Sequence, residues 1–141
     1  MLRRLCYVRL HKHRVVSATT DAQCYTGAGV TVYSALRKSG AQSGDWVVLL
    51  GAGGGLGHLA TQIASRSMGM RVIGIDAGSK KDIATECGAE VFIDHTQGKA
   101  EEEVMKVTGG LGAQAVLVLT AANGAYARYD NTFALLDVRH G

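Results

Sequence analysis

Short apolar runs recur along this chain and are separated by segments of mixed polarity. Residues 46–50 (WVVLL) form a continuous apolar run that is too short for a helix. Such a run is typical of a parallel strand whose two faces are both covered. Residues 71–76 (RVIGID), 90–94 (EVFID) and 114–120 (QAVLVLT) repeat the pattern. The pattern therefore predicts four strands.

The segments between these runs have helical spacing. Residues 29–38 end in Arg37 and Lys38 shortly before Gly40, which is typical of a helix C-terminus. Residues 79–88, 99–110 and 122–136 predict further helices, and the segment 99–110 begins with glutamates, which the helix dipole favours there. After the first strand, one helical face is formed by Leu56, Leu59, Ala60, Ile63, Ala64 and Met68.

Strands and helices thus alternate with short connections, which predicts right-handed crossovers. The fold class we expect is α/β, a Rossmann-type doubly wound parallel sheet of about four strands with flanking helices. Residues 1–23 show no sustained period and are predicted to be a basic, poorly organised arm. Residues 24–141 are predicted to be a single domain.

Composition narrows the class of protein. Apolar residues make up 47% and charged residues 19%, and no apolar run approaches the roughly 18 residues that span a bilayer. We therefore expect a soluble cytoplasmic protein without a membrane segment. The net charge of +3 comes from the arm, because five Arg and Lys residues lie between Arg3 and Arg14 and no acid precedes Asp21. That arm leaves a mitochondrial presequence open, whereas the scarcity of aromatic residues in it disfavours nucleic acid. The three cysteines are spaced too widely for a CxxC metal site and fit free thiols: Cys6, Cys24 and Cys87.

A glycine-rich loop follows the first strand and opens the next helix. Only glycine lets backbone amides at a helix N-terminus approach a pyrophosphate closely, so this arrangement predicts dinucleotide binding. The usual G-x-G-x-x-G spacing does not fit, whereas G-x-x-G-x-x-G does, through Gly51, Gly54 and Gly57. A tight turn that binds nothing is the alternative. The loop residues predicted to contact the coenzyme are Gly51, Ala52, Gly53, Gly54, Gly55, Leu56 and Gly57.

Asp76 ends the second strand, where a carboxylate can accept hydrogen bonds from the adenosine ribose hydroxyls. It would repel a 2′-phosphate and so favours NAD over NADP. Arg71, Lys80 and Lys81 weaken this argument because they offer positive charge nearby. His58 and His95 lie at positions where a phosphate or adenine contact is conceivable, but solvated histidines are the preferred interpretation.

With these residues in place, the chain resembles the coenzyme-binding domain of zinc-type medium-chain alcohol dehydrogenases, especially those of yeasts and fungi. The similar stretches are residues 28–60 (AGVTVYSALRKSGAQSGDWVVLLGAGGGLGHLA), 68–81 (MGMRVIGIDAGSKK) and 88–96 (GAEVFIDHT). The resemblance implies an NAD-dependent oxidation of an alcohol to an aldehyde or ketone. It also implies that Lys81 assists at the ribose and that Thr31 lies near the nicotinamide.

The chain departs from the family pattern at the catalytic zinc. The family's last zinc-binding cysteine, immediately before the AGVTVY segment, corresponds to Gly27, and Cys24 lies upstream by several ångströms of chain. The other ligands belong to a catalytic domain that residues 1–20 do not resemble, and His11 and His13 are interpreted as solvated. Zinc is expected of the family, yet no catalytic residue or metal ligand is assigned here.

The resemblance also predicts a strand order of 3-2-1-4 without the family's last two strands. The strand at 114–120 would then be an unpaired edge that invites self-association. Two alternatives stay open. One is a non-catalytic NAD-binding or interaction module, and the other is a zinc-independent, NADPH-dependent quinone or enoyl reductase.

Overall fold

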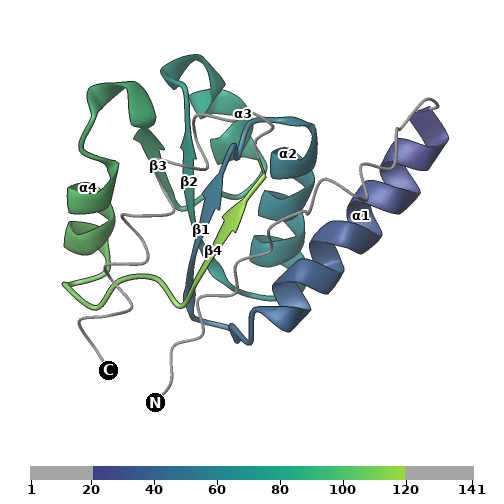
Figure 1. Cartoon of the computed structure of the whole chain (residues 1–141), viewed down its shortest axis with the longest axis horizontal. Helices are drawn as coiled ribbons and strands as arrows, with labels where there is room; N and C mark the ends of the chain where they lie inside the picture. Colours follow the sequence, from purple (N-terminus) through teal and green to yellow (C-terminus); the bar gives the residue numbers. More distant parts are fainter. Residues whose placement is uncertain (1–20, 120–141) are drawn as a thin grey trace.

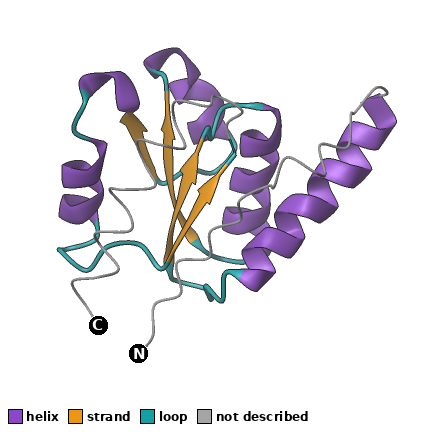
Figure 2. Cartoon of the chain, viewed as in Figure 1, coloured by secondary structure: helices purple, strands orange, loops and turns teal. Residues whose placement is uncertain are grey.

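The fold is a parallel sheet between two layers of helices (Figures 1 and 2). The structure, a computed structural model, describes residues 21–119, with side chains described from residue 29. All strand pairs are parallel, and the order is β3-β2-β1-β4, so the predicted order 3-2-1-4 is confirmed. The strands are β1 (Trp46–Leu50), β2 (Arg71–Asp76), β3 (Val91–Asp94) and β4 (Ala115–Val118).

Helices cover both faces of the sheet, as a doubly wound fold requires. One face packs against α1, α2 and α3, and the opposite face packs against α4 (Figure 2). The helices are α1 (Asp21–Lys38), α2 (Gly55–Gln62), α3 (Lys81–Glu86) and α4 (Ala100–Val107), with short turns of other helix types at η2 (Ile63–Ser67), η3 (Gly78–Lys80) and η4 (His95–Gln97).

The continuous apolar run of β1 is explained by burial on both sides. Val47 and Leu49 belong to the cluster under α1 and α2, whereas Val48 and Leu50 belong to the cluster under α4. These four side chains are at most 2% exposed. Alternation of apolar and polar residues is absent from β1 because neither face meets water.

Helix α1 is longer than the sequence pattern predicts. It begins at Asp21 rather than at residue 29, so the last residues of the predicted arm belong to it. The added segment contains Gly27 but no proline, and glycine costs a helix only about 1 kcal/mol relative to alanine. The rest of the arm, with Cys6, His11 and His13, lies outside the described residues, as does the helix predicted at 122–136.

Helix α2 does not run unbroken to Met68, as the apolar stripe predicts. It ends at Gln62 and continues as the π-helical turn η2, closed by the Met68 N–H to the Ile63 carbonyl at 3.0 Å. Within η2 the Ser65 hydroxyl donates to the Thr61 carbonyl at 2.7 Å. Such bonds to the preceding turn bend helices. The helix predicted at 99–110 ends three residues early, at Val107. The remaining predicted boundaries agree to within one or two residues, which is the usual uncertainty of helix and strand ends.

No helix in the part of the chain that the structure describes is long and apolar enough to cross a membrane.

Candidate functional site

The glycine loop joins β1 to α2 at the carboxyl edge of the sheet. Gly51 has a φ of +83°, which favours glycine, and its N–H donates to the Ile75 carbonyl of β2 at 2.8 Å. The Gly54 N–H then donates to the Gly51 carbonyl at 3.1 Å. The loop therefore turns back tightly on itself before α2 begins.

The fold requires some of these glycines and not others. A Cβ on Gly57 would lie 1.8 Å from the Gly51 carbonyl oxygen, and one on Gly53 would lie 2.5 Å from the Lys80 Cβ. A Cβ on Gly55, in contrast, would meet nothing within 4 Å. The G-x-x-G-x-x-G spacing thus has a structural basis at its first and last positions, while the exposed Gly55 leaves open space at the start of α2.

Asp76 lies against this loop. Its Oδ2 accepts the Gly53 N–H at 2.9 Å, and its Oδ1 accepts the Ala77 N–H at 2.7 Å. The side chain is half-buried. Each carboxylate oxygen can accept more than one hydrogen bond, so the group keeps acceptor capacity for hydroxyl donors. The sequence places both features at one edge of the sheet but does not reveal the bond between them.

The three basic residues expected near Asp76 differ in position. The stem of Lys80 packs beside Gly53, and Lys81 is the exposed first residue of α3. Arg71 is at the other end of β2, so the expectation that it offers charge to this site is wrong. Its guanidinium is bound to Glu90 at 2.6 and 3.1 Å and is stacked 3.8 Å from the Trp46 ring centroid.

Arg71→Ala is therefore expected to leave any coenzyme preference unchanged. Both partners of the Arg71–Glu90 ion pair are 46% exposed, so solvent screens the pair and the loss of stability should be small. Urea unfolding and coenzyme titration of the variant check the two statements. A changed ratio of NADH to NADPH affinity would contradict the placement of Arg71.

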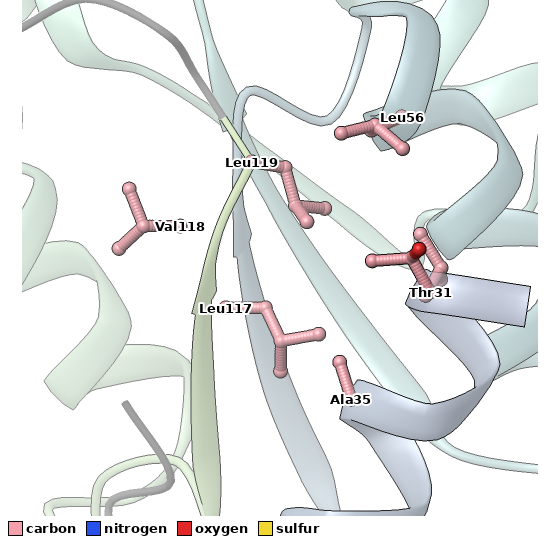
Figure 3. A pocket seen from close by; sticks show the side chains of 7 residues that line it. Thr31, Ala35, Leu56, Leu117, Val118 and Leu119 are labelled. Carbon is pink, nitrogen blue, oxygen red and sulfur yellow. The ribbon is translucent and has the colours of Figure 1, made fainter. Parts of the chain in front are cut away.

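A small apolar pocket lies on the side of the glycine loop away from Asp76. It is formed between α1, α2 and the carboxyl end of β4 (Figure 3). Thr31, from an exposed position on α1, and Leu56, from the first turn of α2, both line it. Figure 3 shows Leu117 and Leu119 on the same side as these residues. The structure thus brings together the predicted contacts at residues 51–57 with Thr31 on one side and Asp76 on the other. The pocket is lined by Thr31, Val32, Ala35, Leu56, Leu117, Val118 and Leu119.

Asp94, at the end of β3, is a feature that the sequence analysis missed. It pairs in register with Asp76 on β2. The Thr96 hydroxyl and the Thr96 backbone N–H donate to its Oδ1 at 2.6 and 2.9 Å, and these bonds hold the pKa of Asp94 below its ordinary value. The only signal in the sequence is the Asp-x-Thr spacing, which is common in turns.

Asp94→Asn is expected to destabilise the chain in a pH-dependent way. Because the folded pKa lies below the unfolded value of about 3.9, the carboxylate stabilises the fold at neutral pH, and this contribution is lost as the pH falls through the folded pKa. The difference in urea midpoint between wild type and variant should be full above about pH 5 and shrink toward about pH 3. A difference that stays constant over this range would contradict the assignment.

The two histidines differ in their exposure. His58 is half-buried in the first turn of α2, with Nδ1 3.0 Å from the Gly54 carbonyl oxygen. His95 is exposed in η4. Cys87, a free thiol, receives a long hydrogen bond from Gln62 Nε2 at 3.7 Å.

No group of three or more His, Cys, Asp or Glu side chains that could hold a metal ion occurs among the residues that the structure describes. Positions 24 and 27, which the family pattern links to zinc, both lie in α1, and their side chains are outside the described set.

Comparisons with known proteins agree with this geometry. Alcohol dehydrogenase 2 of Emericella nidulans is 47% identical over an alignment that covers 79% of this chain and 34% of that protein. The crystal structure of the alcohol dehydrogenase from Aeropyrum pernix aligns with a TM-score of 0.62 and 29% identity, over 72% of this chain and 30% of that one. Quinone oxidoreductase of Escherichia coli, complexed with NADPH, aligns with a TM-score of 0.55 and 29% identity, over 59% and 26%.

The chain thus spans about a third or less of the length of these relatives. It is homologous to the NAD-binding part of medium-chain alcohol dehydrogenases and quinone oxidoreductases. The family model for zinc-binding dehydrogenases matches residues 55–134, more than half of the sequence, beginning at the first residue of α2. The chain belongs to the zinc-binding dehydrogenase family.

Proposed function

We propose that this chain binds NAD as the coenzyme-binding domain of an alcohol dehydrogenase-like oxidoreductase. Members of the family bind NAD(P), so dinucleotide binding is implied for this chain. One observation carries the finer proposal: the Asp76 carboxylate is hydrogen-bonded at 2.9 Å to a backbone amide of the glycine loop. A ribose acceptor and a phosphate-binding loop thereby adjoin at the carboxyl edge of a parallel sheet, where α/β proteins bind nucleotides.

The pyrophosphate would lie at the N-terminus of α2. The first N–H groups of a helix have no partner within the helix, and the N-cap residue Gly54 provides no side-chain hydrogen bond. The first turn of α2 also contains no acidic residue. Backbone amides and the positive end of the helix dipole are therefore available to an anion. The open space at Gly55 allows a phosphate to approach the backbone.

The two ends of the coenzyme would extend in opposite directions from this loop. Asp76 would accept hydrogen bonds from the adenosine ribose, with Lys81 assisting. The nicotinamide would lie toward the apolar pocket that Thr31 and Leu56 line. The proposed contacts are therefore residues 51–57, Asp76, Lys81 and Thr31.

The bound coenzyme would accept hydride as an alcohol is oxidised to an aldehyde or ketone. This chain's own residues would bind and orient the coenzyme, and we assign none of them a catalytic role. We further propose that the coenzyme domain extends over residues 24–141, after a basic arm at 1–23. Zinc and an alcohol site are expected from the family rather than from the described residues.

A reductase that uses NADPH is the second candidate function. It is favoured by the similarity to the Escherichia coli quinone oxidoreductase complexed with NADPH. Asp76 separates the two candidates, because a carboxylate repels a 2′-phosphate where it would accept a hydrogen bond from a 2′-hydroxyl. Quinone reduction assays with both coenzymes distinguish the two activities.

The proposal is tested by titrating the full chain with NADH and with NADPH while following coenzyme fluorescence. We expect a saturable change with NADH and weaker binding of NADPH. The absence of saturable binding would overturn the proposed function. Tighter binding of NADPH would instead favour the second candidate.

A further inference from the structure

The short connection between β2 and α3, residues 77–80, is held from both sides. On one side the Ala77 N–H donates to Asp76 at 2.7 Å, and the stem of Lys80 packs against Gly53 of the glycine loop. On the other side, Gly78 lies against Asp94 at the end of β3. Residues 77–80 therefore lie between the glycine loop and the carboxylate of Asp94, which is not among the proposed coenzyme contacts.

The two carboxylate oxygens of Asp94 contact different neighbours. Oδ1 accepts both Thr96 donors and so caps η4. Oδ2 faces Gly78, because a Cβ added to Gly78 would lie 2.5 Å from that oxygen. The Gly78 backbone N–H also helps to hold the pKa of the Asp94 carboxyl below its ordinary value. A side chain at residue 78 is thus excluded by Asp94 itself.

We infer that Asp94 is a positioning residue for the adenosine end of the coenzyme site, where it fixes residues 77–80 and thereby governs the selectivity between NAD and NADP. This inference rests on the proposed function. Asp94 acts through its neighbours: it holds Gly78, and the adjacent Ala77 N–H holds the Asp76 carboxylate in place. The same connection keeps Lys80 against the glycine loop.

The position of residues 77–80 determines how well the site distinguishes NADH from NADPH. A fixed Asp76 carboxylate can accept a hydrogen bond from the 2′-hydroxyl of NADH, whereas it repels the 2′-phosphate of NADPH. When residues 77–80 are no longer held, Asp76 loses its fixed donor, and Lys80 becomes free to move toward a phosphate. NADH affinity then falls more than NADPH affinity, so the dissociation constants for the two coenzymes become more similar.

The test compares Asp94→Asn with Thr96→Val in the full chain, using NADH and NADPH as probes. An asparagine side chain has one acceptor oxygen instead of two, so it cannot serve both Thr96 and Gly78 as a carboxylate does. Thr96→Val removes only the hydroxyl bond to Oδ1 and leaves Gly78 held. We expect Asp94→Asn to narrow the ratio of the two dissociation constants by about fivefold, on the scale of one ordinary hydrogen bond, and Thr96→Val to leave it unchanged.

A second comparison tests the contact directly and does not depend on the folding of Asp94→Asn. Gly78→Ala places a methyl group against Oδ2 and is expected to narrow the same ratio. In an Asp94→Ala background the carboxylate oxygen that the new methyl group would meet is absent. Adding Gly78→Ala should then cause no further change in the ratio of the two dissociation constants. Non-additivity of this kind indicates direct coupling between neighbouring residues.

The outcomes separate this inference from the proposed function. If wild type fails to bind NADH, the proposed function is overturned. If wild type binds NADH but Asp94→Asn and Gly78→Ala both keep its selectivity, only the positioning role is overturned. If Asp94→Asn weakens NADH and NADPH binding equally, the role of Asp94 is merely structural, which also overturns the inference.

Discussion

Gly57→Ala is expected to lower the free energy of unfolding by about 3 kcal/mol or more. A Cβ at this position would lie 1.8 Å from the Gly51 carbonyl oxygen and 2.8 Å from the Ala52 carbonyl carbon. These are backbone atoms that no side-chain rotation can move, so α2 must shift away from the end of β1. Urea unfolding of variant and wild type measures the effect.

Gly55→Ala is the matched control. It lies in the same loop and helix start, but a Cβ there would meet nothing within 4 Å. Alanine also has a higher helix propensity than glycine, so the free energy of unfolding should stay within about 0.5 kcal/mol of wild type or rise slightly. The same variant should nonetheless weaken NADH binding, since its methyl group occupies the space proposed for a phosphate. Equal losses of stability in both variants would contradict the loop geometry.

Asp76→Ala is expected to weaken NADH binding by about tenfold or more and to reduce the preference for NADH over NADPH. The substitution removes the ribose acceptor, and it also leaves the Gly53 and Ala77 amides without their carboxylate partner. Fluorescence titration with both coenzymes measures the two affinities.

Asp45→Ala controls for the loss of a carboxylate that binds a backbone amide. Asp45 accepts the Gln42 N–H at 2.8 Å just before β1, at the amino edge of the sheet. Its removal should leave both coenzyme affinities unchanged. If the two aspartate variants had the same effect on NADH affinity, Asp76 would have no specific role.

The sheet could be predicted from the sequence because its strands are buried on both faces. Continuous apolar runs such as residues 46–50 are typical of strands that helices cover on both sides, and β1 and β2 match their predicted bounds. The start of α1 and the π-turn η2 could not be predicted. Both depend on weak local preferences and on hydrogen bonds, such as that of Ser65, which periodicity does not report.

The proposed site was predictable in its parts but not in its connections. The glycine loop and Asp76 stand out in the sequence, since each follows a strand and both fall at one edge of a parallel sheet. Arg71 lies only a few residues before Asp76, yet an extended strand places it at the opposite edge. The roles of Asp94 and Gly78 depend on the pairing of β2 with β3, which brings distant residues into register.

The most direct test of the proposed coenzyme site is an NMR titration of the full ¹⁵N-labelled chain with NADH, read at each backbone amide. The account predicts saturable shifts that centre on Gly53, Gly55, Gly57 and Ala77, at the loop and at the end of β2. The amino edge of the sheet, marked by Arg71, should stay unchanged. Saturable shifts confined to other residues, or none at all, would contradict the account.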